Sequence, residues 1–120
     1  MKDSIIRAKS FAFATRIVNM YKFLTDKKKE FILSKQLLRS GTSIGANIHE
    51  GLQGQSKKDF VAKLGISLKE ASETEYWLLL LKETGYIDEK AFNSIHLDCV
   101  ELLKLLTSII KTSRQNMDKE

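Results

Sequence analysis

Histidine and cysteine come first, because they supply many of the nucleophiles, general bases and metal ligands of proteins. The chain has two histidines, His49 and His96, and one cysteine, Cys99. His96 and Cys99 could share a helix face, but a structural zinc site requires about four ligands. A Cys–His nucleophile pair would also require an orienting partner and an oxyanion site. We expect Cys99 to fill core space, and we predict no catalytic residue, no metal site, no cofactor and no enzymatic activity.

A row of polar residues in the second predicted helix is the next candidate. Its members are Arg39, Ser43, Asn47 and Glu50. Residues spaced by three or four positions lie on one face of a helix. Hydrogen bonds within such a row, or to a neighbouring helix, would set register or subunit contact. A ligand site or a catalytic site is the alternative, although no general base or nucleophile stands out. We predict a structural or interface role.

Two glycines, Gly41 and Gly45, lie on the same side of this helix. A glycine costs an exposed helix about 1 kcal/mol relative to alanine, so we expect close approach of another helix to compensate. Such spacing is best known from membrane dimers, but nearby Lys35 and Arg39 favour tight packing in water. We therefore assign both glycines to structural or interface positions. The stretch around them does not match a phosphate-binding loop, and it lies within a helix rather than between strand and helix.

Basic residues are concentrated in the first half of the chain. Residues 1–60 hold 12 Lys/Arg and 5 Asp/Glu, a net charge of +7, whereas residues 61–120 hold 8 and 10, a net charge of −2. This polarity favours either polyanion binding or attraction between the two halves. We predict nucleic-acid contacts, mainly to the backbone, at Lys27, Lys28, Lys29, Lys35, Lys57 and Lys58. The structural alternative is a solvated surface that keeps the protein soluble.

The lysines form two clusters. In an up-down bundle, the connections that carry Lys27–Lys29 and Lys57–Lys58 lie at opposite ends, so we expect no single patch on one chain. We also expect no aromatic platform for single strands among these lysines.

The elements that position these residues are helices. The chain has no proline, and its apolar residues recur with a helical period. We predict helices at about 4–24, 30–53, 57–84 and 89–114, capped at Ser56 and Asp88 and ended at Gly85. In the first helix we expect Phe11 to widen the apolar face. Short connections then predict an all-α, antiparallel up-down four-helix bundle, a single domain over residues 1–120.

The N-terminus lacks the continuous apolar segment that is typical of a signal peptide. The longest apolar run, Tyr76–Leu81, is far too short to span a membrane. We expect a cytoplasmic protein without membrane contact.

Several motifs resemble the "four helix bundle protein" family, first noticed as products of intervening sequences in bacterial 23S ribosomal RNA genes. They are the R-S-G-T-S-I-G-A-N-I-x-E-G pattern within Leu37–Gly51, and the segments Ser56–Phe60, Glu70–Trp77 and Gly85–Ile87. His49 departs from the small residue expected there. The resemblance implies a four-helix subunit in a ring-like homopentamer, no enzymatic activity, and RNA or DNA binding through basic surfaces. Similarity to accessory proteins of diversity-generating retroelements implies a reverse transcriptase as a protein partner.

Two functions are therefore expected from the sequence. The first is a non-enzymatic homo-oligomeric bundle that binds RNA or DNA by charge. The alternative is an oligomeric scaffold for a protein partner, without direct nucleic-acid contact.

Overall fold

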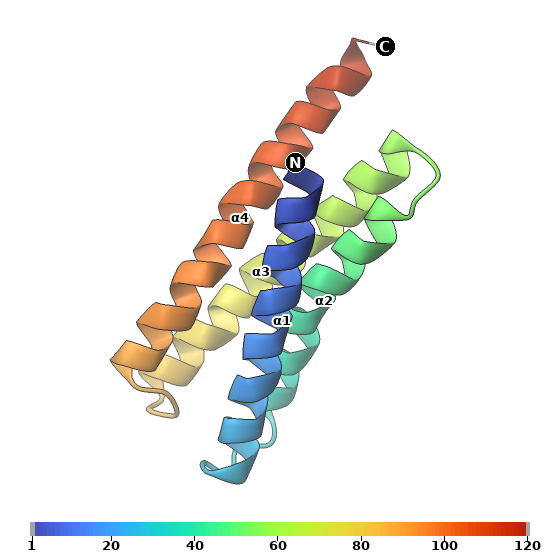
Figure 1. Cartoon of the computed structure of the whole chain (residues 1–120). Helices are drawn as coiled ribbons and strands as arrows, with labels where there is room; N and C mark the ends of the chain where they lie inside the picture. Colours follow the sequence, from blue (N-terminus) through green and yellow to red (C-terminus); the bar gives the residue numbers. More distant parts are fainter. Residues whose placement is uncertain (1, 120) are drawn as a thin grey trace.

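Four long helices make up the protein in a computed structural model that describes residues 2–119 (Figure 1). No strand occurs within this range. The helices are α1 (Lys2–Asp26), α2 (Leu33–Leu52), α3 (Lys57–Glu83) and α4 (Glu89–Asp118). The predicted all-α four-helix bundle is confirmed.

The helices run alternately up and down, and each packs against its neighbours in chain order, with α4 closing on α1 (Figure 1). The bundle measures 52 × 22 × 21 Å. Contact between α2 and α3 is the most extensive, whereas α1 and α4 touch least. The α1–α2 and α3–α4 loops lie at one end, and the α2–α3 loop lies at the other.

The core follows from apolar residues that recur about every seven positions, two turns of an α-helix. Each helix therefore turns one face inward, where its side chains are almost completely buried. The central residues are Ile6, Phe13, Ile17, Leu24, Leu37, Ile44, Ile48, Leu64, Ala71, Leu78, Leu81, Ile95, Cys99, Leu102 and Leu106. Phe11, expected to widen this face, is instead 74% exposed. It lies two positions before Phe13, which places it on another side of the helix.

The predicted helix ends are correct where the capping residue bonds to its own helix. Ser56 Oγ accepts the Asp59 N–H at 3.1 Å, and Asp88 accepts the Ala91 N–H at 2.7 Å. Gly85 has the left-handed conformation with φ 84°. Both caps and the glycine stop are confirmed.

The second helix begins later than expected, at Leu33 instead of residue 30. Glu30 lies before the helix and caps it, as described below. Most other helix ends lie within two residues of the predicted ones. The exception is α4, which continues to Asp118, past the expected end near residue 114.

Buried polar side chains tie α2 to α3. Ser67 Oγ donates to the Ile44 carbonyl at 2.7 Å, and Thr74 Oγ1 donates to Ser40 Oγ at 2.9 Å. Within the described residues, every buried side-chain nitrogen or oxygen has a hydrogen-bond partner. Between residues 2 and 119, no helix is both long and apolar enough to cross a bilayer.

Candidate nucleic-acid interface

Glu30 organises the loop that carries the triple lysine. Its carboxylate accepts three backbone N–H groups at the start of α2: those of Ile32 at 3.2 Å, Leu33 at 3.1 Å and Ser34 at 2.7 Å. The side chain of Ser34 donates back to the Glu30 carbonyl at 2.8 Å. Burial alone would raise the pKa of Glu30, but these backbone donors hold it below its ordinary value. The carboxylate thus points into the loop rather than toward solvent.

The turn before Glu30 depends on Lys29, which has a left-handed backbone with φ 54°. Such a conformation is uncommon for residues other than glycine. It returns the chain toward α1, where the Glu30 N–H donates to the Leu24 carbonyl at 3.0 Å. This reversal turns the acidic side chain inward while the preceding lysines stay outside.

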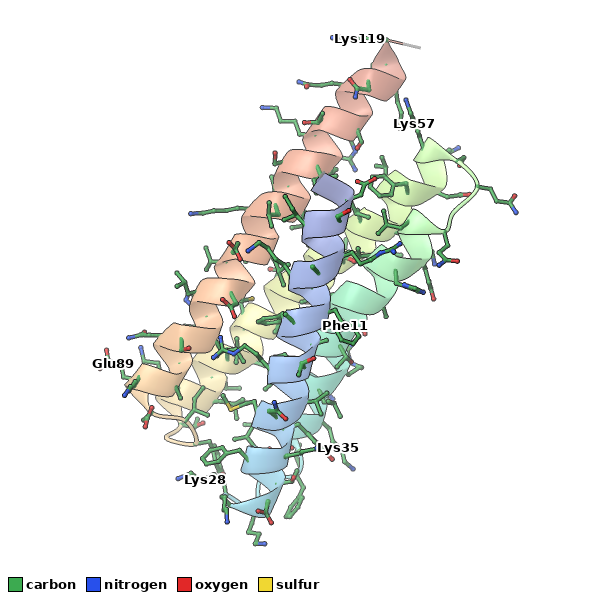
Figure 2. All side chains as sticks on the ribbon, viewed as in Figure 1. Phe11, Lys28, Lys35, Lys57, Glu89 and Lys119 are labelled. Atoms are coloured by element: carbon green, nitrogen blue, oxygen red, sulfur yellow. The ribbon has the colours of Figure 1, made fainter. Side chains whose placement is uncertain are left out.

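Lys27, Lys28 and Lys29 are all exposed, as is Lys35 in the first turns of α2. Figure 2 shows Lys28 and Lys35 at the same end of the bundle. Lys27 Nζ lies 3.7 Å from Asp26 Oδ2, and both side chains are more than two-thirds exposed. Such an exposed ion pair is weak and leaves Lys27 available to a polyanion.

Large apolar side chains lie among these lysines. Phe23 is 41% exposed, Phe31 is 53% exposed and Ile32 is 76% exposed. The Lys28 ammonium lies 5.8 Å from the centroid of the Phe23 ring. We call this surface the basic tip, defined by Phe23, Lys27, Lys28, Lys29, Phe31, Ile32 and Lys35.

Two exposed aromatic side chains, Phe23 and Phe31, therefore accompany the first lysine cluster, where the sequence predicted no aromatic platform for single strands. The signal was present in the sequence, because Phe31 follows Lys29 by two positions. The predicted helix begins at residue 30 and therefore includes Phe31, and an aromatic residue in a helix is usually interpreted as part of its apolar face.

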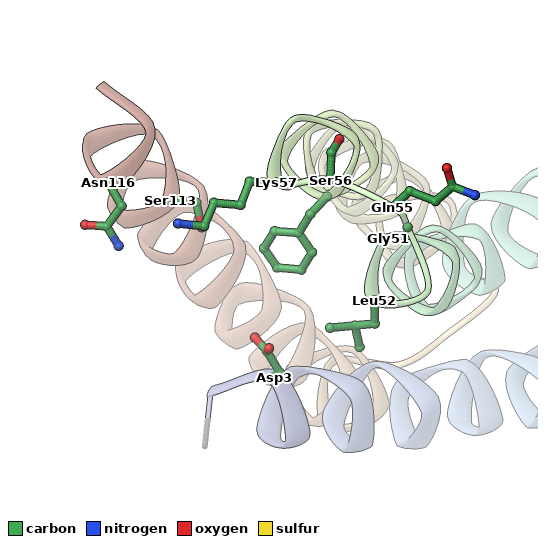
Figure 3. Close-up of a pocket in the computed structure, with 10 residues that line it drawn as sticks. Asp3, Gly51, Leu52, Gln55, Ser56, Lys57, Ser113 and Asn116 are labelled. Atoms are coloured by element: carbon green, nitrogen blue, oxygen red, sulfur yellow. The ribbon is translucent and has the colours of Figure 1, made fainter. Parts of the chain in front are cut away.

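Lys57 and Lys58 lie at the start of α3, and Figure 2 shows Lys57 at the opposite end of the bundle. Both are exposed. Lys57 lines a hollow of about 460 Å³ between the α2–α3 loop and the ends of α1 and α4, and Figure 3 shows its side chain extending toward Ser113. The structure therefore places the predicted nucleic-acid residues on two separate surfaces of one chain.

The polar row of α2 is occupied by contacts within the subunit. Arg39 donates to Glu70 at 3.2 Å and also to Glu73, and Trp77 Nε1 donates to Glu73 at 2.9 Å. The hydrogen bond to Glu73 raises the pKa of Arg39. Bonds from Trp77 and then Arg39 lower the pKa of Glu73. These contacts link α2 to α3.

The remaining members of the row continue the pattern. Ser43 Oγ donates to the Arg39 carbonyl at 2.6 Å, and Asn47 Nδ2 donates to the Ser43 carbonyl at 2.8 Å. Glu50 pairs with Lys63 of α3 at 2.9 Å. Arg39 and Glu50 thus contact α3, whereas Ser43 and Asn47 bond to the backbone of α2 itself. A role of the row between subunits stays a prediction.

The two glycines of α2 face α1. A Cβ at Gly41 would lie 2.7 Å from the Ile17 side chain, and one at Gly45 would lie 3.3 Å from the Ser10 carbonyl oxygen. The helices approach too closely for larger residues at Gly41. The expected close approach is thus present within one subunit.

Cys99 is completely buried, and its thiol donates to the Ala71 carbonyl at 3.5 Å. Burial, followed by the nearby Glu75 carboxylate, raises its pKa to about 12. A raised pKa makes the buried thiol a poorer nucleophile near neutral pH.

His96, the other member of the candidate pair, contacts Glu75 of α3 at 2.8 Å and stacks on Phe92. Within residues 2–119, no group of three or more metal-ligating side chains is placed to hold an ion.

An apolar groove runs between α1 and α2 beside Gly45. It has a volume of about 490 Å³, and its lining includes Phe11, Ala46 and His49 together with the charged Arg7 and Glu50. Phe11 projects outward from α1 (Figure 2). The groove is a candidate contact between copies of the chain.

The family model for 23S rRNA-intervening sequence proteins matches residues 2–108. The chain is also similar to a crystal structure from Bacteroides thetaiotaomicron, described as a protein of unknown function from the S23 ribosomal protein family. The two are 60% identical over 92% of this chain and 99% of that chain, with a TM-score of 0.91. No curated protein matches the chain.

Proposed function

This chain belongs to the 23S rRNA-intervening sequence protein family, and from that premise we propose that it is a non-enzymatic homo-oligomeric bundle that binds RNA or DNA through basic surfaces. The observation that carries the proposal is the basic tip, where four exposed lysines gather while Glu30 is turned inward. An outward Glu30 would add to the repulsion of phosphate by the exposed Asp26 carboxylate, and here Glu30 caps a helix instead.

Self-association is the second part of the proposal, and a ring of five copies in the cytoplasm is its specific form. The exposed Phe11 ring and the apolar groove beside it support self-association, because such surfaces are usually covered in solution. A ring would repeat the basic tip by symmetry and multiply its attraction for one polyanion.

The nucleic-acid part is tested with a labelled structured RNA titrated across a salt series. Charge-driven binding weakens with salt, with a log–log slope of roughly −0.7 to −0.9 for each phosphate neutralised. Replacing Lys27, Lys28 and Lys29 together by glutamine should reduce the magnitude of this slope by about 1 for each lysine that contacts phosphate.

The matched control replaces three exposed lysines of α3 and α4, Lys69, Lys104 and Lys111, by glutamine. It makes the same change in net charge away from the basic tip. Equal loss in the two variants would assign binding to net charge alone, and absence of binding at low salt would refute the proposal. The variant pair Lys57→Gln and Lys58→Gln measures the contribution of the opposite end.

A scaffold for a protein partner is the second candidate function. It is favoured by exposed apolar side chains on α3 and α4, where Leu79 is 46% exposed and Leu97 is 71% exposed. Retention of one defined host protein after nuclease treatment, with its loss on Leu97→Glu, would favour this function. Retention that depends on nucleic acid would favour the first.

A further inference from the structure

The basic tip exposes large apolar side chains. Phe31 and Ile32 are exposed, although the same loop buries the Glu30 carboxylate beside them. Burial of apolar side chains is the main favourable term in folding, so this arrangement does not serve the stability of the single chain. It does provide a surface that is both cationic and apolar.

Few ligands match both properties. The phosphates of a nucleic-acid duplex satisfy lysines but leave aromatic rings without a partner, because the bases are stacked inside. An unpaired strand offers phosphates together with exposed base faces, and proteins that bind single strands combine positive charge with aromatic stacking.

Phe23 shows how a ring in this surface is oriented. The Lys28 ammonium lies over its face, 5.8 Å from the centroid, so that face is turned toward the charged surface. A shallow hollow of about 510 Å³ lies beside the ring, between Lys22 and Lys27, with Asp26 on its rim. The hollow is large enough for a flat base, and its charged lining by Lys22, Asp26 and Lys27 disfavours an acyl chain.

We propose that the basic tip binds unpaired nucleotides of RNA or DNA, with Phe23 and Phe31 stacking on bases while Lys27, Lys28, Lys29 and Lys35 contact the flanking phosphates. This inference rests on the proposed nucleic-acid function and adds a preference for single strands over duplex. Lys28 moves from the Phe23 ring to a phosphate when a base takes its place.

The test compares an unstructured, labelled DNA strand of about 20 nucleotides with the same strand in a duplex, since one single-strand module covers roughly 4–16 nucleotides. Fluorescence anisotropy at fixed salt measures both affinities. Phe31→Leu and Phe23→Leu keep apolar bulk but remove the ring. We expect the double variant to bind the single strand roughly fivefold or more weakly, with duplex binding changed less than about twofold.

Leu97→Ala is the matched control, because Leu97 is 71% exposed and has no ring, but lies on α4 outside the basic tip. We expect it to leave single-strand affinity unchanged, and Phe31→Trp to retain it. Light scattering on each variant establishes that the oligomeric state is the same.

Three outcomes overturn the inference. If the wild type binds strand and duplex equally, and the triple lysine variant weakens both, the proposed function stands and the stacking role fails. If no nucleic acid binds, both fail. If vesicles containing phosphatidylserine bind more tightly than the strand, and Ile32→Ala weakens that binding as much as Phe31→Leu does, the tip is a membrane contact instead.

Discussion

The two helical hairpins of the bundle use opposite designs. In the α1–α2 hairpin, Gly41 lets the backbone of α2 approach Ile17 closely. In the α3–α4 hairpin, Gly65 has open space beside it, and the helices are joined through side chains such as His96 on Glu75. The first hairpin is held by close backbone approach, and the second by side-chain contacts.

The loops of the two hairpins also differ, in which side chains they bury, although both loops lie at one end of the bundle. The α1–α2 loop buries an acid, Glu30, and exposes Phe31 and Ile32. The α3–α4 loop buries Ile87, while its acid, Asp88, caps α4 from an exposed position. The second loop buries its apolar side chain and exposes its charged one, as the hydrophobic effect favours. The first loop departs from this pattern, because its exposed apolar side chains do not stabilise the chain by burial.

The largest contrast is expected between the isoleucines of these loops. Ile87→Ala should destabilise the protein by about 2–5 kcal/mol, because it removes buried methyl groups and leaves a cavity. Ile32→Ala should change the unfolding free energy by less than about 0.5 kcal/mol. Denaturant unfolding at a fixed protein concentration measures both. Equal losses would show that Ile32 is covered in the assembled protein.

The glycines give the next contrast. Gly41→Ala should destabilise by about 1–3 kcal/mol, because its Cβ would lie 2.7 Å from the branched, buried Ile17 side chain. Gly65→Ala should stabilise by about 0.5–1 kcal/mol, since alanine favours the helix and nothing lies within 4 Å of the new Cβ. Thermal melts of the two variants should therefore shift in opposite directions. A stabilised Gly41→Ala variant would contradict the close approach of α1 and α2.

The smallest contrast concerns the acids of the two loops. Glu30→Gln should cost about 1–3 kcal/mol, because an amide cannot accept all three N–H groups and its own N–H₂ faces donors. Asp88→Ala should cost about 1 kcal/mol, as expected for an exposed cap. Urea denaturation near neutral pH compares them, and a Glu30→Gln loss below that of Asp88→Ala would weaken the assigned role of Glu30.

The pH dependence of Glu30 has a definite sign. Its pKa is lowered in the folded protein from the ordinary value of 4.5, so its contribution is complete above that value and is lost as the pH falls through the lower, folded value. The difference in stability between wild type and Glu30→Gln should therefore shrink below about pH 4.5. A constant difference across this range would show that the carboxylate charge does not stabilise the cap.

Much of the fold could be predicted because its signals are local. Ser56, Asp88 and Gly85 each act within one turn of their own helix, so their roles can be read from neighbouring residues. The start of α2 could not, because Glu30 reaches forward to three backbone N–H groups while its own N–H returns to Leu24. Whether Glu30 belongs to the helix or caps it depends on the left-handed backbone of Lys29, which the sequence does not predict.

In the candidate site, too, the local features could be predicted and the contacts between helices could not. Arg39 and Glu50 were recognisable as members of one face, but their partners Glu70, Glu73 and Lys63 lie on another helix. Pairing across helices depends on rotation and register, which periodicity leaves open.

By itself, the sequence determined the four helices, their inward faces and the positive charge of the first half, since all three follow from residue types and their spacing. Tertiary structure decided which side chains the basic tip exposes. Glu30 turns inward because the reversal at Lys29 brings its carboxylate to the first N–H groups of α2, while Phe31 stays exposed.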